Sequence, residues 1–249
     1  MQNKTHLDLV FNDDPKTIHL MAKDRIFYYF VKRLMDIVVS LTLLVILLPL
    51  MLLIAIAILL YSPGPVFFVQ ERVGSKRLYQ GRYIKWREVT FSCYKFRTMH
   101  VNTDSTIHQE FVQALIENDQ EKMMELQGEE TGVGKLIKDP RITRPGKLLR
   151  KLSLDELPQL LNVLRGDMSL VGPRPAIPYE IKMYKPWHMG RLQAQPGITG
   201  LQQVTARSAA DFDEQTRLDI EYINKQSLWL DLQIALRTPF VIISTKGAH

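Results

Sequence analysis

The sequence predicts an α+β protein with a proline-kinked, re-entrant membrane helix near its N-terminus and a small, helix-rich cytosolic domain. A long run without charged residues contains one central proline. Several later segments place apolar residues at helical spacing, and only two short ones read as strands. We therefore divide the chain into a polar N-terminal extension (1–24), an interfacial and re-entrant membrane segment (25–61) and a cytosolic domain (62–249) with a short sheet and interfacial amphipathic helices.

The chain length, net charge and cysteine count narrow the class of protein. A chain of 249 residues suffices for one large domain or two small ones. Its formal charge of +6 favours an anionic partner: a nucleotide, a nucleic acid or lipid headgroups. Cys93 is the only cysteine, which excludes an internal disulfide and a metal site built from several cysteines.

The membrane segment is the strongest compositional signal. Residues 1–24 are polar, and we expect a surface extension or a short helix there. Residues 25–36 mix basic, aromatic and aliphatic side chains, which suits a membrane–water boundary. The 24 residues from Ile37 to Leu60 include no charge and are long enough to cross a bilayer.

The way this segment inserts depends on its proline. Pro49 removes a backbone hydrogen bond in mid-helix, so we expect a kink. Each half is too short to cross the bilayer alone. Basic residues flank both sides, and the positive-inside rule then favours both ends in the cytoplasm. These observations favour a helix that enters and leaves by one face; a single kinked span is the alternative.

The segments after the membrane run predict a short sheet, then helices. Val66–Gln70 reads as a short strand followed by a basic loop through Gly74. Phe91–Met99 reads as a second strand, or as a strand that enters a helix. Lys95 and Arg97 would share a strand face, as a two-cation patch or as an ordinary solvated face. Residues 101–135 are acidic and predict one or two amphipathic helices in an insertion.

A basic stretch follows the insertion. Lys138 to Lys151 carries six basic residues against one acid and ends in a helical pattern. Such a helix can lie on anionic lipid or supply phosphate ligands. Arg150 stands five residues before Asp155, within reach of the same site.

The segment Ser153–Pro175 combines two adjacent carboxylates with a rigidly framed guanidinium. Asp155 and Glu156 stand at an expected helix start, whose N-cap would be either Ser153, which fits a capping box with Glu156, or Asp155 itself. With either N-cap, the helix dipole favours ionised Asp155. A turn at 165–167 follows, and then Arg174 between two prolines. Acids and Arg together suit a site for phosphate and a divalent metal, whereas two ordinary capping carboxylates are the alternative.

The C-terminal part predicts two further helices. Residues 211–224 form an acidic helix that contains Asp219. Residues 228–243 are apolar but interrupted, so this helix either lies at the membrane interface or packs on the core.

Taken together, these motifs resemble one family. The proline-kinked membrane segment, YKFRTM, DPRITRPGKLLRKLSLDELPQLLNVLRGDMSLVGPRP, PGITG and LWLDLQIALRT are similar to those of the bacterial sugar transferases. The chain resembles the compact, monotopic polyprenol-phosphate phosphoglycosyl transferases, from about residue 26 to its C-terminus. The family's larger members carry extra N-terminal transmembrane helices.

The resemblance implies a two-step reaction and its residues. Asp155 would attack the β-phosphate of a UDP-sugar and release UMP, with Glu156 as its acid/base partner. The polyprenyl (undecaprenyl) phosphate would then take the sugar phosphate. Mg²⁺, bound partly through Asp155, would offset the diphosphate charge. The positions that match the family's substrate- and phosphate-binding residues are Arg97, Arg150, Arg174, Arg207 and Asp219.

The resemblance also implies partners and a location. The donor would be a UDP-sugar and the acceptor a polyprenyl phosphate in the lipid bilayer, with no nucleic acid partner and a homo-oligomer left open. The domain would face the cytoplasm at the bacterial inner membrane, where it would begin exopolysaccharide, O-antigen or glycoprotein glycan assembly. A membrane-bound glycosyltransferase that releases UDP and a non-catalytic scaffold of a polysaccharide complex remain as alternatives.

The chain departs from the family pattern at three places. Thr205 and Ala206 replace the usual Asn-Gly before Arg207, which removes a flexible glycine. Leu48 replaces the usual Ser before Pro49. The 101–135 insertion is longer than in the smallest members. We expect it to serve either as an oligomerisation element or as a lid.

Overall fold

The computed structural model describes residues 17–22, 25–80, 83–101, 106–127, 141–205 and 210–244. We call the adjacent carboxylates Asp155 and Glu156 the dyad. The elements before the dyad are β1 (Thr17–Ala22), α1 (Ile26–Tyr61), β2 (Phe67–Gln80), β3 (Tyr83–Phe96), α2 (Thr106–Glu117), α3 (Gln120–Gln127) and α4 (Arg144–Lys151). The later ones are the 3₁₀ helix η1 (Leu154–Gln159), α5 (Leu160–Arg165), β4 (Ser169–Val171), α6 (Pro178–Ile181), the 3₁₀ helix η2 (Pro186–Leu192), β5 (Gly197–Thr199), α7 (Leu201–Thr205), α8 (Phe212–Lys225) and α9 (Leu228–Ile243).

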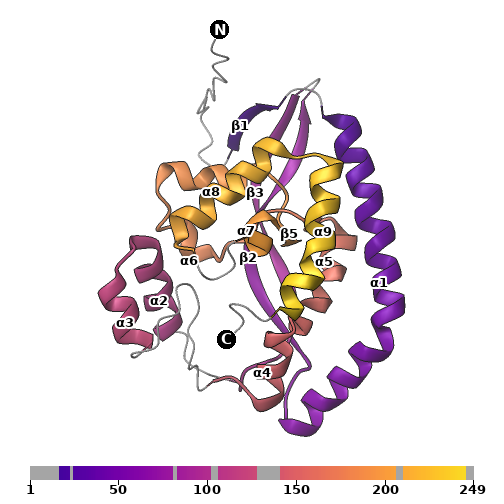
Figure 1. The fold of residues 1–249 in the computed structure, drawn as a ribbon, viewed down its shortest axis with the longest axis vertical. Coiled ribbons are helices and arrows are strands. Elements are labelled where there is room, and N and C mark those ends of the chain that lie inside the picture. Colours follow the sequence, from indigo (N-terminus) through magenta and orange to yellow (C-terminus); the bar gives the residue numbers. More distant parts are fainter. Residues whose placement is uncertain are drawn as a thin grey trace.

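A long hairpin runs through the centre of the molecule (Figure 1). β2 and β3 pair antiparallel from Phe67↔Phe96 to Gln80↔Tyr83, and β1 pairs with the outer side of β3. A second, two-stranded sheet is parallel and joins β4 to β5. The predicted mixture of helices and short sheet is therefore confirmed.

Two strand predictions were wrong in extent. The expected basic loop through Gly74 continues as strand to Gln80, because its partner strand supplies the hydrogen bonds that the local pattern does not reveal. Residues 17–22 form β1 on the hairpin edge, where the sequence predicted an extension or a short helix. These pairings depend on residues distant in sequence.

The helix α1 is continuous through Pro49 and spans 36 residues. It is the one helix in the described part of the chain that is long and apolar enough to cross a membrane, and 17% of its most apolar window is buried. Figure 1 shows α1 following a bent path along one side of the molecule, with both of its ends beside the domain. Leu34, Leu41, Val45 and Leu53 are among its exposed side chains.

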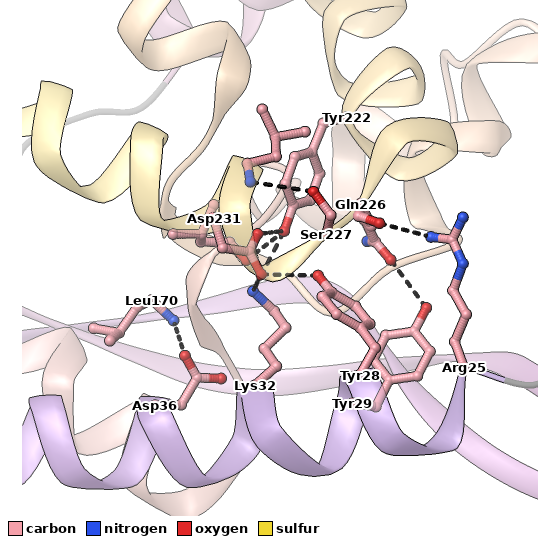
Figure 2. A network of polar contacts seen from close by, with 12 residues as sticks. Arg25, Tyr28, Tyr29, Lys32, Asp36, Leu170, Tyr222, Gln226, Ser227 and Asp231 are labelled. Atoms are coloured by element: carbon pink, nitrogen blue, oxygen red, sulfur yellow. Dashed lines mark hydrogen bonds and ion pairs between the residues drawn. The ribbon is translucent and has the colours of Figure 1, made fainter.

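The first end of α1 (residues 26–40) is held by a buried polar network (Figure 2). Asp231 of α9 accepts hydrogen bonds from Tyr28 Oη at 2.8 Å, Lys32 Nζ at 2.9 Å and Tyr222 Oη at 2.6 Å. Asp36 accepts a bond from the Leu170 backbone at 2.9 Å. Since each charge has a partner, burial is tolerated, and directional bonds fix the helix against α8, α9 and β4.

The second end of α1 (residues 51–61) is held by apolar packing. Ile54 and Ile58 are 7% and 3% exposed and lie in one cluster with Phe96 of β3 and Leu149 of α4. Full burial of each isoleucine is worth about 1.5–3 kcal/mol. Both ends of α1 are therefore attached to the same domain.

The predicted helices after the hairpin form with modest boundary changes. α2 and α3 lie within the 101–135 insertion and cover a separate apolar cluster of Phe111, Leu115 and Met123 against Phe212 of α8. Residues 128–135 of that insertion lie outside the described residues. The predicted helices 211–224 and 228–243 are confirmed as α8 and α9.

The face of α9 resolves an alternative that the sequence left open. Ile234 and Asp231 point into the protein, whereas Trp229, Leu236 and Phe240 are 67%, 60% and 74% exposed. The helix therefore packs on the core with one side and presents an apolar stripe on the other.

Candidate active site

The carboxylate pair lies on η1, a short 3₁₀ helix between α4 and α5. Ser153 immediately before it adopts the left-handed conformation (φ 54°) and makes no capping bond through its side chain. The predicted capping box of Ser153 and Glu156 is therefore wrong. A left-handed serine costs about 1–2 kcal/mol relative to a right-handed one, and strain of this kind concentrates at functional sites.

Asp155 is nearly enclosed, with 8% of its surface exposed. Burial raises the pKa of Asp155 to about 6, and the negative charge of Glu156 adds to the rise. The charges of Lys95 and Arg150 act in the opposite direction. The expectation that a helix dipole would favour ionised Asp155 is wrong in sign, because η1 is too short to carry much dipole and desolvation dominates.

Glu156 points to the hairpin. Its Oε1 accepts a hydrogen bond from Lys95 Nζ of β3 at 2.6 Å, in an ion pair whose side chains are 32% and 19% exposed. The two carboxylates therefore have different surroundings, one desolvated and one paired with a cation, as their spacing on a helix predicts.

Arg97 has a different partner from Lys95. Its Nη1 donates to Pro63 O at 2.9 Å and its Nη2 to Ser62 O at 2.6 Å, and the residue is 5% exposed. The guanidinium thus binds the carbonyl groups that follow α1. A Cβ on Gly64 would lie 2.2 Å from Arg97 Nη1, so only glycine leaves space for this contact. The two predicted cations of the patch serve separate segments.

Arg150 and Arg174 are exposed cations, and Arg150 lies near Asp155 whereas Arg174 lies near Arg72. Arg150 stands in the last turn of α4, and its charge lowers the pKa of Asp155. Arg174 is exposed between the buried Pro173 and Pro175. The next residue, Ala176, exchanges backbone bonds of 2.8 and 3.1 Å with Val73 of β2, which ties the Arg174 loop to the hairpin.

Asp219 lies in the core of the domain. It is 1% exposed and pairs with Arg191 Nη2 at 2.5 Å. Burial raises the pKa of Asp219, and the charge of Arg191 counteracts the rise. The structure therefore places Asp219 in a buried ion pair between α8 and η2. Arg207 lies outside the described residues.

Three residues hold the dyad in place, and of these the sequence drew attention only to Lys95, as part of a possible cation patch. Asn162 is fully buried and bridges α5 to β3, since Nδ2 donates to Ser92 O at 2.7 Å and Oδ1 accepts from Tyr94 N at 3.0 Å. Arg33 of α1 donates to the Val163 and Leu164 carbonyls at the end of α5. Lys95 completes the set. The polar Asn162 within an apolar helix was the one visible signal.

The donor atoms at the dyad suit a magnesium ion shared with a ligand. No three His, Cys, Asp or Glu side chains among the described residues converge as a metal cluster. Mg²⁺ commonly takes one or two carboxylates and completes its shell with phosphate oxygens and water. Because Glu156 is bound to Lys95, Asp155 is the carboxylate that fits this role.

Comparison of the sequence with known proteins identifies a family and several relatives. Residues 27–245 match the family model described as bacterial sugar transferase. The chain is 40% identical over 220 residues to the undecaprenyl-phosphate galactose phosphotransferase of Salmonella typhimurium, which covers 88% of this chain and 42% of that protein. It is 40% identical over 226 residues to the UDP-glucose:undecaprenyl-phosphate glucose-1-phosphate transferase of Caulobacter vibrioides, with 88% and 72% covered.

A third relative is similar in length. The exopolysaccharide production protein ExoY of Rhizobium meliloti is 35% identical over 218 residues, and the match covers 88% of each chain. The chain thus spans less than half the length of some curated relatives and most of the length of others. Since the family match extends over both α1 and the domain with the dyad, the chain belongs to the bacterial sugar transferase family.

Proposed function

We propose that this chain is a phosphoglycosyl transferase, which moves a sugar 1-phosphate from a UDP-sugar to membrane polyprenyl phosphate and releases UMP. The observation that carries the proposal is a nearly buried Asp155 with a pKa of about 6 beside a lysine-paired Glu156. The names of two relatives, a galactose phosphotransferase and a glucose-1-phosphate transferase acting on undecaprenyl phosphate, support the same reaction class.

The first step is a nucleophilic displacement. An Oδ atom of ionised Asp155 attacks the phosphorus that bears the sugar, and the bond from this phosphorus to the bridging oxygen breaks. UMP leaves with the electron pair, and a phosphoglycosyl-aspartate remains. Desolvation suits the nucleophile, because a carboxylate with a raised pKa is more basic and yet mostly ionised at pH 7.

The second step regenerates the enzyme. A phosphate oxygen of the polyprenyl phosphate attacks the same phosphorus, and the Asp155 carboxylate leaves. Glu156 serves as acid/base partner and is held by Lys95. Arg150 and Arg174 offer exposed guanidinium groups to phosphate oxygens. A bound Mg²⁺, held through Asp155, would neutralise diphosphate charge.

The decisive experiment uses purified protein and a labelled UDP-sugar without lipid acceptor. We expect UMP release with label retained on the protein, and loss of both by about 10³-fold or more in Asp155→Asn. Asp167→Asn is the matched control, since Asp167 pairs with a half-exposed Lys76 at 3.0 Å. Release of UDP instead of UMP would favour the glycosyltransferase alternative, and no release at all would favour the scaffold.

The pH dependence of the reaction rate and of the folding stability gives a second test, because the two should change in opposite directions as the pH rises. Because the reaction needs ionised Asp155, UMP release should fall about tenfold per pH unit below pH 6. The unfolded Asp155 ionises near pH 4, so the folded state loses stability from this group as the pH rises from about 4 to 6. Asp155→Asn should therefore raise the melting temperature at pH 8 and leave it unchanged at pH 3.5.

We further propose that α1 is re-entrant and that the domain faces the cytoplasm at the inner membrane. Attachment of both ends of α1 to one domain supports this, because a spanning helix would separate its ends by the bilayer. The exposed stripe of α9 and the basic α4 would lie on the same membrane surface. Tags at both chain termini should be accessible only from the cytoplasm; a periplasmic N-terminal tag would contradict this topology.

A further inference from the structure

Arg72 of β2 is a buried cation that pairs with no acidic side chain in the part of the chain that the structure describes. The residue is 6% exposed. Its Nε and Nη2 donate to Gln70 Oε1 at 3.1 and 2.7 Å, and its Nη1 donates to Pro175 O at 3.1 Å. All of these acceptors are neutral. None of the ion pairs among the described residues includes Arg72. Burying an uncompensated charge costs several kcal/mol, so its retention needs a physical reason.

The hairpin places Arg72 between the dyad and the Arg174 loop. Gln70 pairs with Cys93 and Arg72 with Phe91, so the side chains of Gln70, Arg72, Cys93 and Lys95 share one face of the sheet. On this face Lys95 binds Glu156 and Arg72 binds Pro175, the residue after Arg174. One rigid element therefore holds both parts of the proposed site.

The electrostatic surroundings point to an anion. Burial lowers the pKa of Arg72, and the nearby charge of Arg174 lowers it further. The charges of Glu180 and Glu156 act in the opposite direction, but neither carboxylate forms an ion pair with Arg72. The buried guanidinium of Arg72 and the exposed guanidinium of Arg174 are therefore close enough for their charges to repel each other.

We propose that Arg72 is a positioning residue that holds the Arg174 loop and keeps a positive charge behind it, compensated only when the diphosphate of a UDP-sugar binds. This inference rests on the proposed function and deepens it. Gln70 is the neutral acceptor that orients the guanidinium without cancelling its charge. A carboxylate at position 70 would accept the same hydrogen bonds and neutralise the positive charge of Arg72.

Gln70→Glu therefore separates the charge from the structure. The substitution keeps the shape and both hydrogen bonds and gives Arg72 a buried ion pair. We expect a melting temperature equal to or above that of the wild type, together with UDP binding about tenfold weaker by calorimetry at low salt. Gln120→Glu, which adds the same charge at an exposed position of α3, should bind UDP as the wild type does.

A second variant tests the hydrogen bonds. Arg72→Lys keeps the charge but cannot bind Gln70 and Pro175 together, so the Arg174 loop loses its support. We expect a lower melting temperature and UDP binding about threefold weaker than that of the wild type. The proposal is overturned if Gln70→Glu binds UDP within twofold of the wild type, or if Arg72→Lys changes neither the melting temperature nor UDP binding.

Failure of this inference is distinct from failure of the proposed function. Wild-type protein that binds no UDP, or an Asp155→Asn variant that still retains label, would refute the proposed reaction. Wild-type binding with an unaffected Gln70→Glu would refute only the role of Arg72.

Discussion

The two ends of α1 are attached to the domain by opposite kinds of interaction. The first end uses buried charges and hydroxyls around Asp231 (Figure 2). The second end uses Ile54 and Ile58, which pack against Phe96 and Leu149. Hydrogen bonds between buried charges are directional, whereas apolar packing tolerates small displacements. The angle of the helix is therefore set at its first end, and the second end mainly adds stability.

The largest effect should come from Lys32→Met. This substitution leaves Asp231 charged and buried beside two hydroxyls, which should cost about 3–5 kcal/mol of unfolding free energy. Denaturant unfolding in detergent micelles measures it. The double variant Lys32→Met/Asp231→Leu should recover most of the lost stability, since no unpaired charge remains. A double variant as unstable as the single one would contradict the view that the buried ion pair holds the first end of α1.

An intermediate effect is expected at the second end. Ile58→Ala removes a side chain that is 3% exposed and should cost about 2–4 kcal/mol through lost burial and a cavity. Because no charge is involved, the loss should be the same at low and high salt in the unfolding assay. Ile56→Ala is the matched control, since Ile56 is 53% exposed. A strong salt dependence of Ile58→Ala would erase the contrast between the two ends.

The smallest effect should come from Tyr28→Phe. The change removes one hydroxyl that donates to Asp231 at 2.8 Å, while Lys32 and Tyr222 still bind the carboxylate. We expect a loss of about 1.5 kcal/mol, measured by the same unfolding experiment. A loss as large as that of Lys32→Met would mean that the hydroxyls rather than the ion pair hold the first end.

Parts of the fold could be predicted because their signals are local. The uncharged run identified α1, the periodic patterns identified α8 and α9, and Gly166 ends α5 in the left-handed conformation that the predicted turn requires. The two prolines that frame Arg174 in the sequence are buried, and Arg174 between them is exposed. Each of these features depends on a few neighbouring residues.

The remaining features depend on contacts across the chain. The pairing of Lys95 with Glu156 joins residues 61 positions apart. The raised pKa of Asp155 comes mainly from burial, which no local pattern reports, and the sequence therefore gave the wrong sign. The sequence predicted Gln70 at the end of a short strand and Arg72 in a basic loop. In the structure both lie in the hairpin, and Arg72 donates a hydrogen bond to Pro175 O.

The length of α1 has a further consequence for its rotational phase. Tyr29 and Ile58 are both buried and lie about eight turns apart, so at 100° per residue their directions differ by only about 20°. Two residues inserted near Pro49 would turn Ile54 and Ile58 by about 200°, away from Phe96, whereas an inserted heptad would turn them by about 20°. The two ends of α1 therefore face the domain only when the number of residues between them is close to a whole number of turns. Functional length variants should differ from this chain by three, four or seven residues rather than by two.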